Sequence, residues 1–211
     1  MTVSTHSLIW RGVDEWYVEA TDVELETSSL VASGIQVGAD PLPYRLDYRL
    51  DVGCGFVTRA LVVNARGSGW SRRLELRHDG RGRWSVEADR DGAVTLPDPG
   101  GEASSFDGAL DCDLARSPLT NLMPIRRSGL DSRPGEEEFL MAWVSVPDLS
   151  VAPSRQRYEH LRRTEFGSVV RYVDRGVVAG FTTDLHLDDD GFVLQYPQLA
   201  ERVAGRPEGS A

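Results

Sequence analysis

"YRLDYRLDV", residues 44–52, alternates apolar and charged side chains without interruption and decides the fold class. A period of two is typical of a β-strand with one buried face and one exposed face. One face of this strand would carry only large apolar or aromatic side chains, and the other only arginine and aspartate. The stretch therefore predicts a strand at the surface of an apolar core. The side chains expected to be buried are Tyr44, Leu46, Tyr48 and Leu50.

The same alternation continues on both sides of this stretch. Asp79-Gly80 falls between two alternating runs and predicts a tight hairpin turn, because glycine adopts positive φ angles freely. The runs are short, and most end in glycine, proline or aspartate, as strands of a meander do. Strands are expected in residues 16–38, 56–67, 70–92, 139–147, 167–191 and 192–197.

These runs predict a mainly β protein in which a curved antiparallel sheet forms an open or half barrel, because twist accumulates from strand to strand. One or two short helices are expected beside the sheet. The first would have Ser117 as its N-cap and Pro118 at its first position. The second would lie in "PQLAERVAG", residues 197–205, with Gly205 as its stop.

The chain of 211 residues is expected to fold as one domain, residues 1–211. A loop rich in proline and glycine, residues 96–108, separates two halves, residues 1–97 and 110–205. The two halves are weakly similar in sequence. Both "LELRHDGRGRW" and "LHLDDDGFVLQY" suggest a strand, an Asp-Gly turn and a second strand that carries an aromatic residue. An ancient duplication and an ordinary antiparallel meander both explain this similarity.

The composition excludes several functions. The formal net charge is −10 and the pI about 4.9, so the basic surface required for nucleic acids or anionic membranes is not expected. All basic residues are arginine, so no lysine is available for a Schiff base or a phosphate-binding loop. Cys54 and Cys112 lack the spacing of a zinc site. We see no signal peptide and no apolar run long enough to span a bilayer, and we expect a cytoplasmic protein.

"DCDLARSPLTNLMPIRR", residues 111–127, departs from the plain alternation. Asp111 and Asp113 would lie on one strand face, where two carboxylates could share a proton or hold a hard cation. We favour a structural role, in which both are hydrogen-bonded to backbone amides or arginines. "PIRR" is expected to be extended, with Arg126 and Arg127 on opposite faces. One arginine would pair with an aspartate, since guanidinium and carboxylate match in a two-pronged geometry.

The histidines and the other acidic groups support no enzyme template. None of the four histidines lies in a HExxH or GxSxG context. His186 alternates with Asp184 and Asp188, for which a solvated acidic strand face is the simpler interpretation. "DDDG", residues 188–191, begins like a calcium loop but lacks its later ligands, and so predicts a charged hairpin turn. We therefore assign no catalytic residue, no metal and no cofactor.

The stretch 111–127 resembles the signature of a bacterial family described as "putative glycolipid-binding" proteins. That signature has an Asp-x-Asp strand, a Ser-Pro-x-Thr-Asn turn, a short linker and Pro-Ile-Arg-Arg. Met123 stands where leucine is common, a change that preserves bulk. Similarity extends to "AWVSVPDLSV", "QRYEH" and "DDDGFVLQYP", and so to nearly the whole chain. The matching residues are Asp111, Asp113, Ser117, Pro118, Thr120, Asn121, Pro124, Ile125, Arg126 and Arg127.

The resemblance implies a single domain of curved antiparallel strands forming an open barrel. Its shape would be similar to that of the bacterial carriers that move lipoproteins between membranes. No catalytic residue is implied by the family name.

The main hypothesis is therefore a non-enzymatic binding protein for a lipid, glycolipid or similar amphiphile, held in the concave face of the sheet. One alternative is an enzyme that uses Asp111 or Asp113 as acid or base on a small polar substrate. Another is a structural or interaction protein without a pocket. No nucleic-acid partner or integral membrane segment is expected, and the oligomeric state is left open. The candidate ligand-binding residues are Asp111, Asp113, Thr120, Asn121, Arg126, Arg127 and Tyr158.

Overall fold

The computed structural model describes residues 3–203, and every strand within them belongs to one 14-stranded sheet. The first seven strands are β1 (Ser4–Gly12), β2 (Tyr17–Leu25), β3 (Leu30–Gly38), β4 (Tyr44–Gly53), β5 (Val57–Gly67), β6 (Trp70–His78) and β7 (Trp84–Gly92). The other seven are β8 (Asp111–Leu114), β9 (Glu136–Val144), β10 (Val151–Thr164), β11 (Gly167–Asp174), β12 (Thr182–Leu187), β13 (Val193–Tyr196) and β14 (Ala200–Arg202). The helices are α1 (Leu122–Ser128) and the 3-10 turns η1 (Cys54–Phe56), η2 (Ala103–Phe106) and η3 (Pro118–Asn121).

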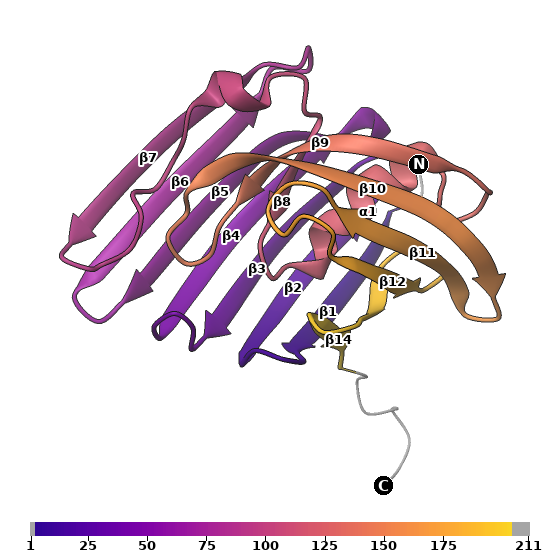
Figure 1. Ribbon diagram of the computed structural model, residues 1–211, viewed down its shortest axis with the longest axis horizontal. Helices are drawn as coiled ribbons and strands as arrows, with labels where there is room; N and C mark the ends of the chain where they lie inside the picture. The colour runs from indigo at the N-terminus through magenta and orange to yellow at the C-terminus, as the bar shows by residue number, and fades with distance from the viewer. Residues whose placement is uncertain (1–2, 204–211) are drawn as a thin grey trace, which may run out of the picture.

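The strand order is β7-β6-β5-β4-β3-β2-β1-β14-β13-β12-β11-β10-β9-β8, so two consecutive meanders meet where β1 pairs with β14. All pairs are antiparallel except β8 with β9, which is parallel. The strands β9–β12 arch across the front of β1–β5 in Figure 1. β7 and β8 are the two edges of the sheet and do not pair with each other. The expectation of an open, curved antiparallel sheet is confirmed, and the sheet does not close into a barrel.

The alternation in "YRLDYRLDV" is buried as expected. Tyr44, Leu46, Tyr48 and Leu50 are all buried on β4, and the residues between them are exposed or half-buried. The ring of Tyr48 lies across Gly34 of β3, where a Cβ would come within 2.4 Å of the ring. Glycine is needed there because a side chain would occupy the space of the tyrosine.

Hairpins also form at both predicted Asp-Gly sites, but their connections, residues 79–83 and 188–192, are longer than a two-residue tight turn. Asp79 Oδ1 accepts hydrogen bonds from the backbone N–H groups of Arg81 and Arg83, at 2.7 and 3.1 Å. In the same way Asp188 Oδ1 accepts from the backbone N–H groups of Asp190 and Phe192. "DDDG" is thus a charged hairpin turn between β12 and β13.

The seam between the two meanders is short but anchored by a buried side chain. β1 pairs with β14 over only three residues, including Trp10 opposite Arg202. The indole Nε1 of Trp10 donates to the Val193 carbonyl at 2.7 Å, and the ring has no exposed surface. A large buried side chain from the first meander therefore bonds to the backbone of the second.

The prediction for "PIRR" was wrong, because these residues form most of the helix α1. Pro124 falls in the first turn of α1, where its missing N–H costs no hydrogen bond. The helix ends at Gly129, with φ 72°, which donates to the Arg126 carbonyl while Leu130 donates to the Ile125 carbonyl. This is a Schellman motif, which favours glycine at the left-handed position.

The second expected helix was also wrong. Ala200–Arg202 is the strand β14, which pairs with both β1 and β13. The tertiary pairing overrides the helical propensity of the short segment "LAER". Gly205, its expected stop, lies outside the described residues. The helix expected after Ser117 is present as η3, with Pro118 as its first residue.

Two remaining expectations concern the cysteines and the membrane. Cys54 is exposed and Cys112 is buried, and both thiols are free. No helix within residues 3–203 has the length and apolar character needed to cross a bilayer.

Candidate functional site

The signature stretch lies inside the curved sheet rather than on its surface. Every residue of 117–125 is buried, which covers η3 and the first half of α1. β8 leads into this segment and pairs in parallel with β9. The sheet therefore wraps around its own connecting segment, and residues 117–125 of the signature form part of the interior.

Asp111 is held by Arg127 in a two-pronged ion pair. The two guanidinium nitrogens lie 2.6 and 2.5 Å from the two carboxylate oxygens, and Arg127 also donates to the Phe56 carbonyl at 3.1 Å. The guanidinium carbon lies 5.3 Å from the ring centroid of Phe139. Burial raises the pKa of Asp111, and the hydrogen bonds and charge of Arg127 oppose that rise. The predicted Asp–Arg pairing is confirmed.

Asp113 belongs to a separate network, in which no arginine takes part among residues 3–203. Its carboxylate accepts from the Thr120 hydroxyl at 2.8 Å and from the Gln156 amide at 2.6 Å. The Tyr158 hydroxyl lies 2.9 Å from both Gln156 Oε1 and Asn121 Oδ1. Burial is the main cause that raises the pKa of Asp113. This network joins four of the candidate residues across β8, η3 and β10.

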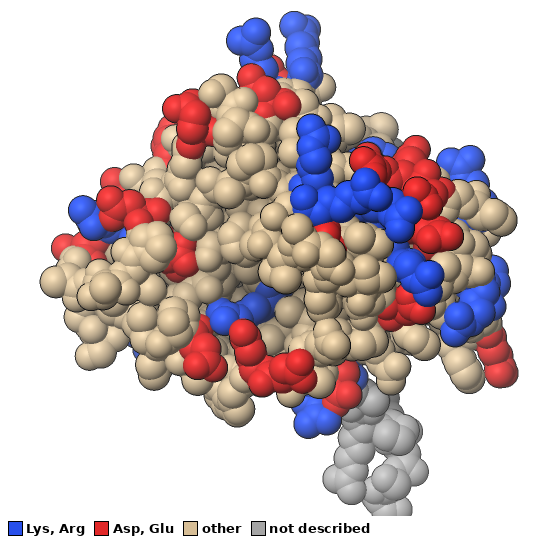
Figure 2. Space-filling model, in the orientation of Figure 1, with Lys and Arg blue, Asp and Glu red and all other residues tan. Residues whose placement is uncertain are grey.

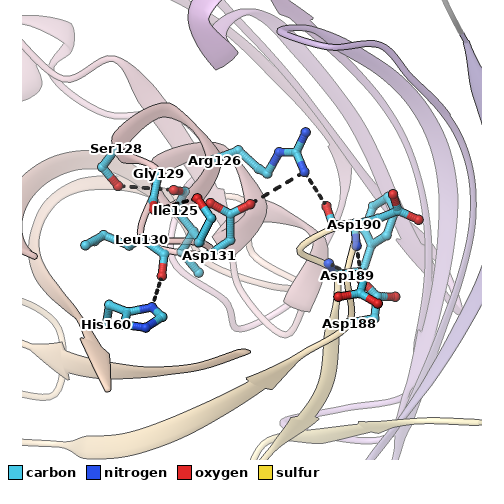
Figure 3. Close-up of polar contacts among 12 residues, drawn as sticks. Ile125, Arg126, Ser128, Gly129, Leu130, Asp131, His160, Asp188, Asp189 and Asp190 are labelled. Carbon is cyan, nitrogen blue, oxygen red and sulfur yellow. Dashed lines mark hydrogen bonds and ion pairs between the residues drawn. The ribbon is translucent and has the colours of Figure 1, made fainter. Parts of the chain in front are cut away.

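Arg126 points toward Asp131 and the turn at Asp190, as Figure 3 shows. Its Nη1 lies 3.5 Å from the Asp131 carboxylate and donates to the Asp190 carbonyl at 3.2 Å. The guanidinium carbon also lies 5.6 Å from the ring centroid of Phe56. Arg126 thus ties the end of α1 to the turn between β12 and β13.

Glu19 is a central residue that the sequence analysis missed. It lies on β2 with no exposed surface, and its Oε1 accepts from the Tyr48 hydroxyl at 2.7 Å and the Ser117 hydroxyl at 2.6 Å. Its Oε2 has no hydrogen-bond partner among residues 3–203. Burial raises the pKa of Glu19 to about 7. The signal was available, since Glu19 occupies an inward position between Tyr17 and Thr21 in the alternation of β2.

A cavity of about 530 Å³ adjoins the signature segment. Of the candidate residues, Asp113 and Asn121 line it, whereas Asp111, Thr120, Arg126, Arg127 and Tyr158 do not. Its walls carry five aromatic side chains, which come from β2, β9, β11, β13 and the segment before β12. These are Tyr17, Trp143, Tyr172, Phe181 and Tyr196.

Three of these aromatic rings pack against one another. The Tyr172 ring centroid lies 5.8 Å from that of Tyr196 and 6.3 Å from that of Phe181. Such spacing is that of favourable aromatic pairs, which bring apolar ring faces and polar hydroxyls together. The cavity therefore has a rigid aromatic wall facing the polar end of η3.

One border of the cavity is held by Asp174, at the end of β11. Its carboxylate accepts from the backbone N–H groups of Gly176, Val177 and Val178, at 2.6, 3.1 and 2.8 Å. Val177 and Val178 line the cavity, yet their side chains are 43% and 60% exposed. The mouth of the cavity thus presents apolar side chains to solvent.

The outer surface carries charges of both signs. Figure 2 shows acidic and basic side chains side by side over the part of the face occupied by β10 and β11. Arg171 of β11 forms an ion pair with Asp184 of β12, at 2.8 Å. A further concavity of about 620 Å³, lined by Arg72 and Arg90 near the end of β7, has no aromatic lining. The aromatic cavity is therefore the better candidate site.

The chain belongs to the family described as "Putative glycolipid-binding", whose sequence profile matches residues 7–202. A crystal structure of a DUF1089 family protein from Pseudomonas aeruginosa is similar in sequence and fold. It is 29% identical, with a TM-score of 0.68, over 92% of this chain and 95% of that chain. No curated protein sequence matches this chain significantly.

Proposed function

We propose that this protein binds a glycolipid or a similar amphiphile in the aromatic cavity, without catalysing a reaction. The observation that carries the proposal is the cavity itself, which combines an aromatic wall with the polar signature residues Asp113 and Asn121. Its volume of about 530 Å³ falls within the range of roughly 300–1,000 Å³ typical of small-molecule sites. The family description supports the same class of ligand.

The geometry disfavours the enzymatic alternative. Both oxygens of Asp111 are engaged by Arg127, and Asp111 does not border the cavity. Asp113 borders the cavity, but each of its oxygens already accepts a hydrogen bond from the protein. A general base must reach the proton that it abstracts. Asp111 does not reach the cavity, and the hydrogen bonds from Thr120 and Gln156 hold Asp113 within the protein's own network, so a structural role is better supported. The pocketless alternative is disfavoured by the cavity.

Binding can be tested with octyl glucoside below its micellar concentration. Native mass spectrometry should show a one-to-one adduct, and tryptophan fluorescence should change because Trp143 lines the cavity. Trp143→Phe should abolish most of the fluorescence change while the adduct persists. Absence of an adduct with any amphiphile tested would contradict the proposal.

A matched pair of variants locates the site. Ala115 lines the cavity, so Ala115→Phe should fill it and weaken binding. Ala60 lies on the outward side of β5, and Ala60→Phe adds the same ring far from the cavity. Equal affinity for both variants, with unchanged melting temperatures, would place the ligand elsewhere.

A further inference from the structure

The charged lining of the aromatic cavity is mainly acidic. Four carboxylates border it, from Asp14, Glu15, Asp113 and Asp174, against one guanidinium among residues 3–203, that of Arg116. A concave, partly desolvated site of one sign concentrates its field on the ligand. The negative charge of this lining therefore influences which head groups the cavity accepts.

The guanidinium of Arg116 is already neutralised within the protein. Its Nε donates to Glu15 at 2.7 Å, and its Nη1 donates to the Val146 carbonyl at 3.0 Å. Its guanidinium carbon also lies 5.9 Å from the ring centroid of Tyr44. Among residues 3–203, the cavity lining therefore offers no unpaired positive charge to an anionic ligand.

Asp113 and Asp174, by contrast, have no ion-pair partner within the described chain. Asp113 is held by a hydroxyl and an amide, and Asp174 by three backbone N–H groups. Neither contact cancels the formal charge of the carboxylate. The charge of Asp174 also adds to the rise in the pKa of Asp113 that burial causes. The two carboxylates therefore act on the same region of the cavity.

Three hydrogen-bond donors of the lining are engaged inside the protein. The Ser117 hydroxyl donates to Glu19, the Asn121 amide to the Pro118 carbonyl, and the Tyr17 hydroxyl to the Leu199 carbonyl. Carboxylate oxygens can each accept more than one hydrogen bond, so acceptors remain available. The lining thus suits a ligand that donates hydrogen bonds.

We propose that the cavity selects amphiphiles whose head group donates hydrogen bonds and is uncharged or cationic, and that it rejects anionic head groups. This inference rests on the amphiphile-binding function proposed above. Hydroxyl and ammonium groups would donate hydrogen bonds to the carboxylates. An ammonium group would also interact with the faces of the aromatic rings. A phosphate would meet like charges in a partly desolvated site, a juxtaposition that strongly disfavours binding.

Three probes with the same octyl chain separate this inference from the proposed function. Octyl glucoside, octylammonium and octyl phosphate differ only in the head group, and their affinities can be compared by calorimetry at low salt. The glucoside or the ammonium should bind at least about tenfold more tightly than the phosphate, which corresponds to 1.4 kcal/mol. Equal or tighter binding of the phosphate would overturn the inference and leave amphiphile binding intact. Binding of none of the three would overturn the proposed function itself.

A charge variant tests the cause of the selectivity. Glu15→Gln on the exposed β1–β2 turn removes the counter-charge of Arg116. The affinity for octyl phosphate relative to octyl glucoside should rise roughly two- to fivefold, the range of an exposed ion pair. Glu24→Gln makes the same change in net charge on β2, away from the cavity, and should leave this ratio unchanged. An unchanged ratio in Glu15→Gln, or an equal rise in Glu24→Gln, would refute the electrostatic account.

Discussion

At the scale of single residues, Arg127 supplies the counter-charge of the buried Asp111 carboxyl group. Arg127→Met retains much of the side-chain bulk but leaves Asp111 desolvated without a counter-charge. We expect the free energy of unfolding to fall by about 3–5 kcal/mol at neutral pH, as measured by urea denaturation. Without Arg127, burial raises the pKa of Asp111 further, so the loss should shrink as the pH falls and Asp111 takes up a proton.

The double variant Asp111→Leu/Arg127→Met is the control for this prediction. It removes both charges, so no unpaired carboxylate remains, and most of the stability should return. A double variant as unstable as Arg127→Met alone would mean that packing, rather than charge, explains the loss.

The buried carboxyl group of Glu19 should make the free energy of unfolding depend on pH. Its pKa is raised from 4.5 to about 7 in the folded protein, so the folded state holds a proton that the unfolded state releases. The stability contributed by this proton is complete below about pH 4.5 and is lost as the pH rises to about 7. Glu19→Gln should remove that dependence and be more stable than the wild type at pH above 7, by on the order of 3 kcal/mol.

Urea denaturation across this pH range checks the prediction. Glu24→Gln, on the exposed face of the same strand, should follow the wild-type profile. A Glu19→Gln protein that loses stability on raising the pH as the wild type does would show that other groups cause the dependence.

At the scale of elements, the capping of α1 sets the position of both arginines. Gly129 has φ 72° and closes the Schellman motif. Gly129→Ala should destabilise the protein by about 1–2 kcal/mol, since a left-handed conformation penalises a Cβ. Gly129→Asn should cost less, because asparagine tolerates this conformation. Thermal unfolding of both variants tests this order, and equal melting temperatures would contradict it.

The strands could be predicted from the sequence better than the segment inside them. The alternation around Tyr48 predicts β4 because one face meets the core and the other meets solvent. Residues 118–125 carry no such contrast, since every one of them is buried. The cue for α1 was the glycine after "IRRS", which marks a helix end. The segment 200–202 pairs at the seam, which only the tertiary structure determines.

The site was predictable only in part, for a similar reason. Pairing of Arg127 with Asp111 follows from their charges and closeness in sequence. The bonds from Gln156 to Asp113 and from Ser117 to Glu19 join residues 43 and 98 positions apart. The periodicity of the sequence does not predict such contacts, because they depend on which strands face each other after the sheet curves.

At the scale of the whole molecule, the two meanders depend on each other. The inner face of β1–β7 is covered by segments that follow it in the chain, since α1 contacts β5 and η2 contacts β7. Glu19 of β2 bonds to Ser117, and Trp10 of β1 bonds to the backbone of β13. The resemblance between residues 1–97 and 110–205 remains a prediction, but the first part does not cover its own inner face.

This dependence predicts that residues 1–97 do not fold alone. In isolation, Leu61 and Leu74 would lose their cover and face water, although both are completely buried in the whole chain. Each such side chain loses about 1.5–3 kcal/mol of burial, which is large against a total stability of roughly 5–15 kcal/mol. The fragment should lack the dispersed amide NMR spectrum of a folded sheet, whereas the full chain should unfold in one transition followed identically by near- and far-ultraviolet circular dichroism. A folded 1–97 fragment, or two separate transitions, would show instead that the first meander is an independent unit to which the signature segment was added.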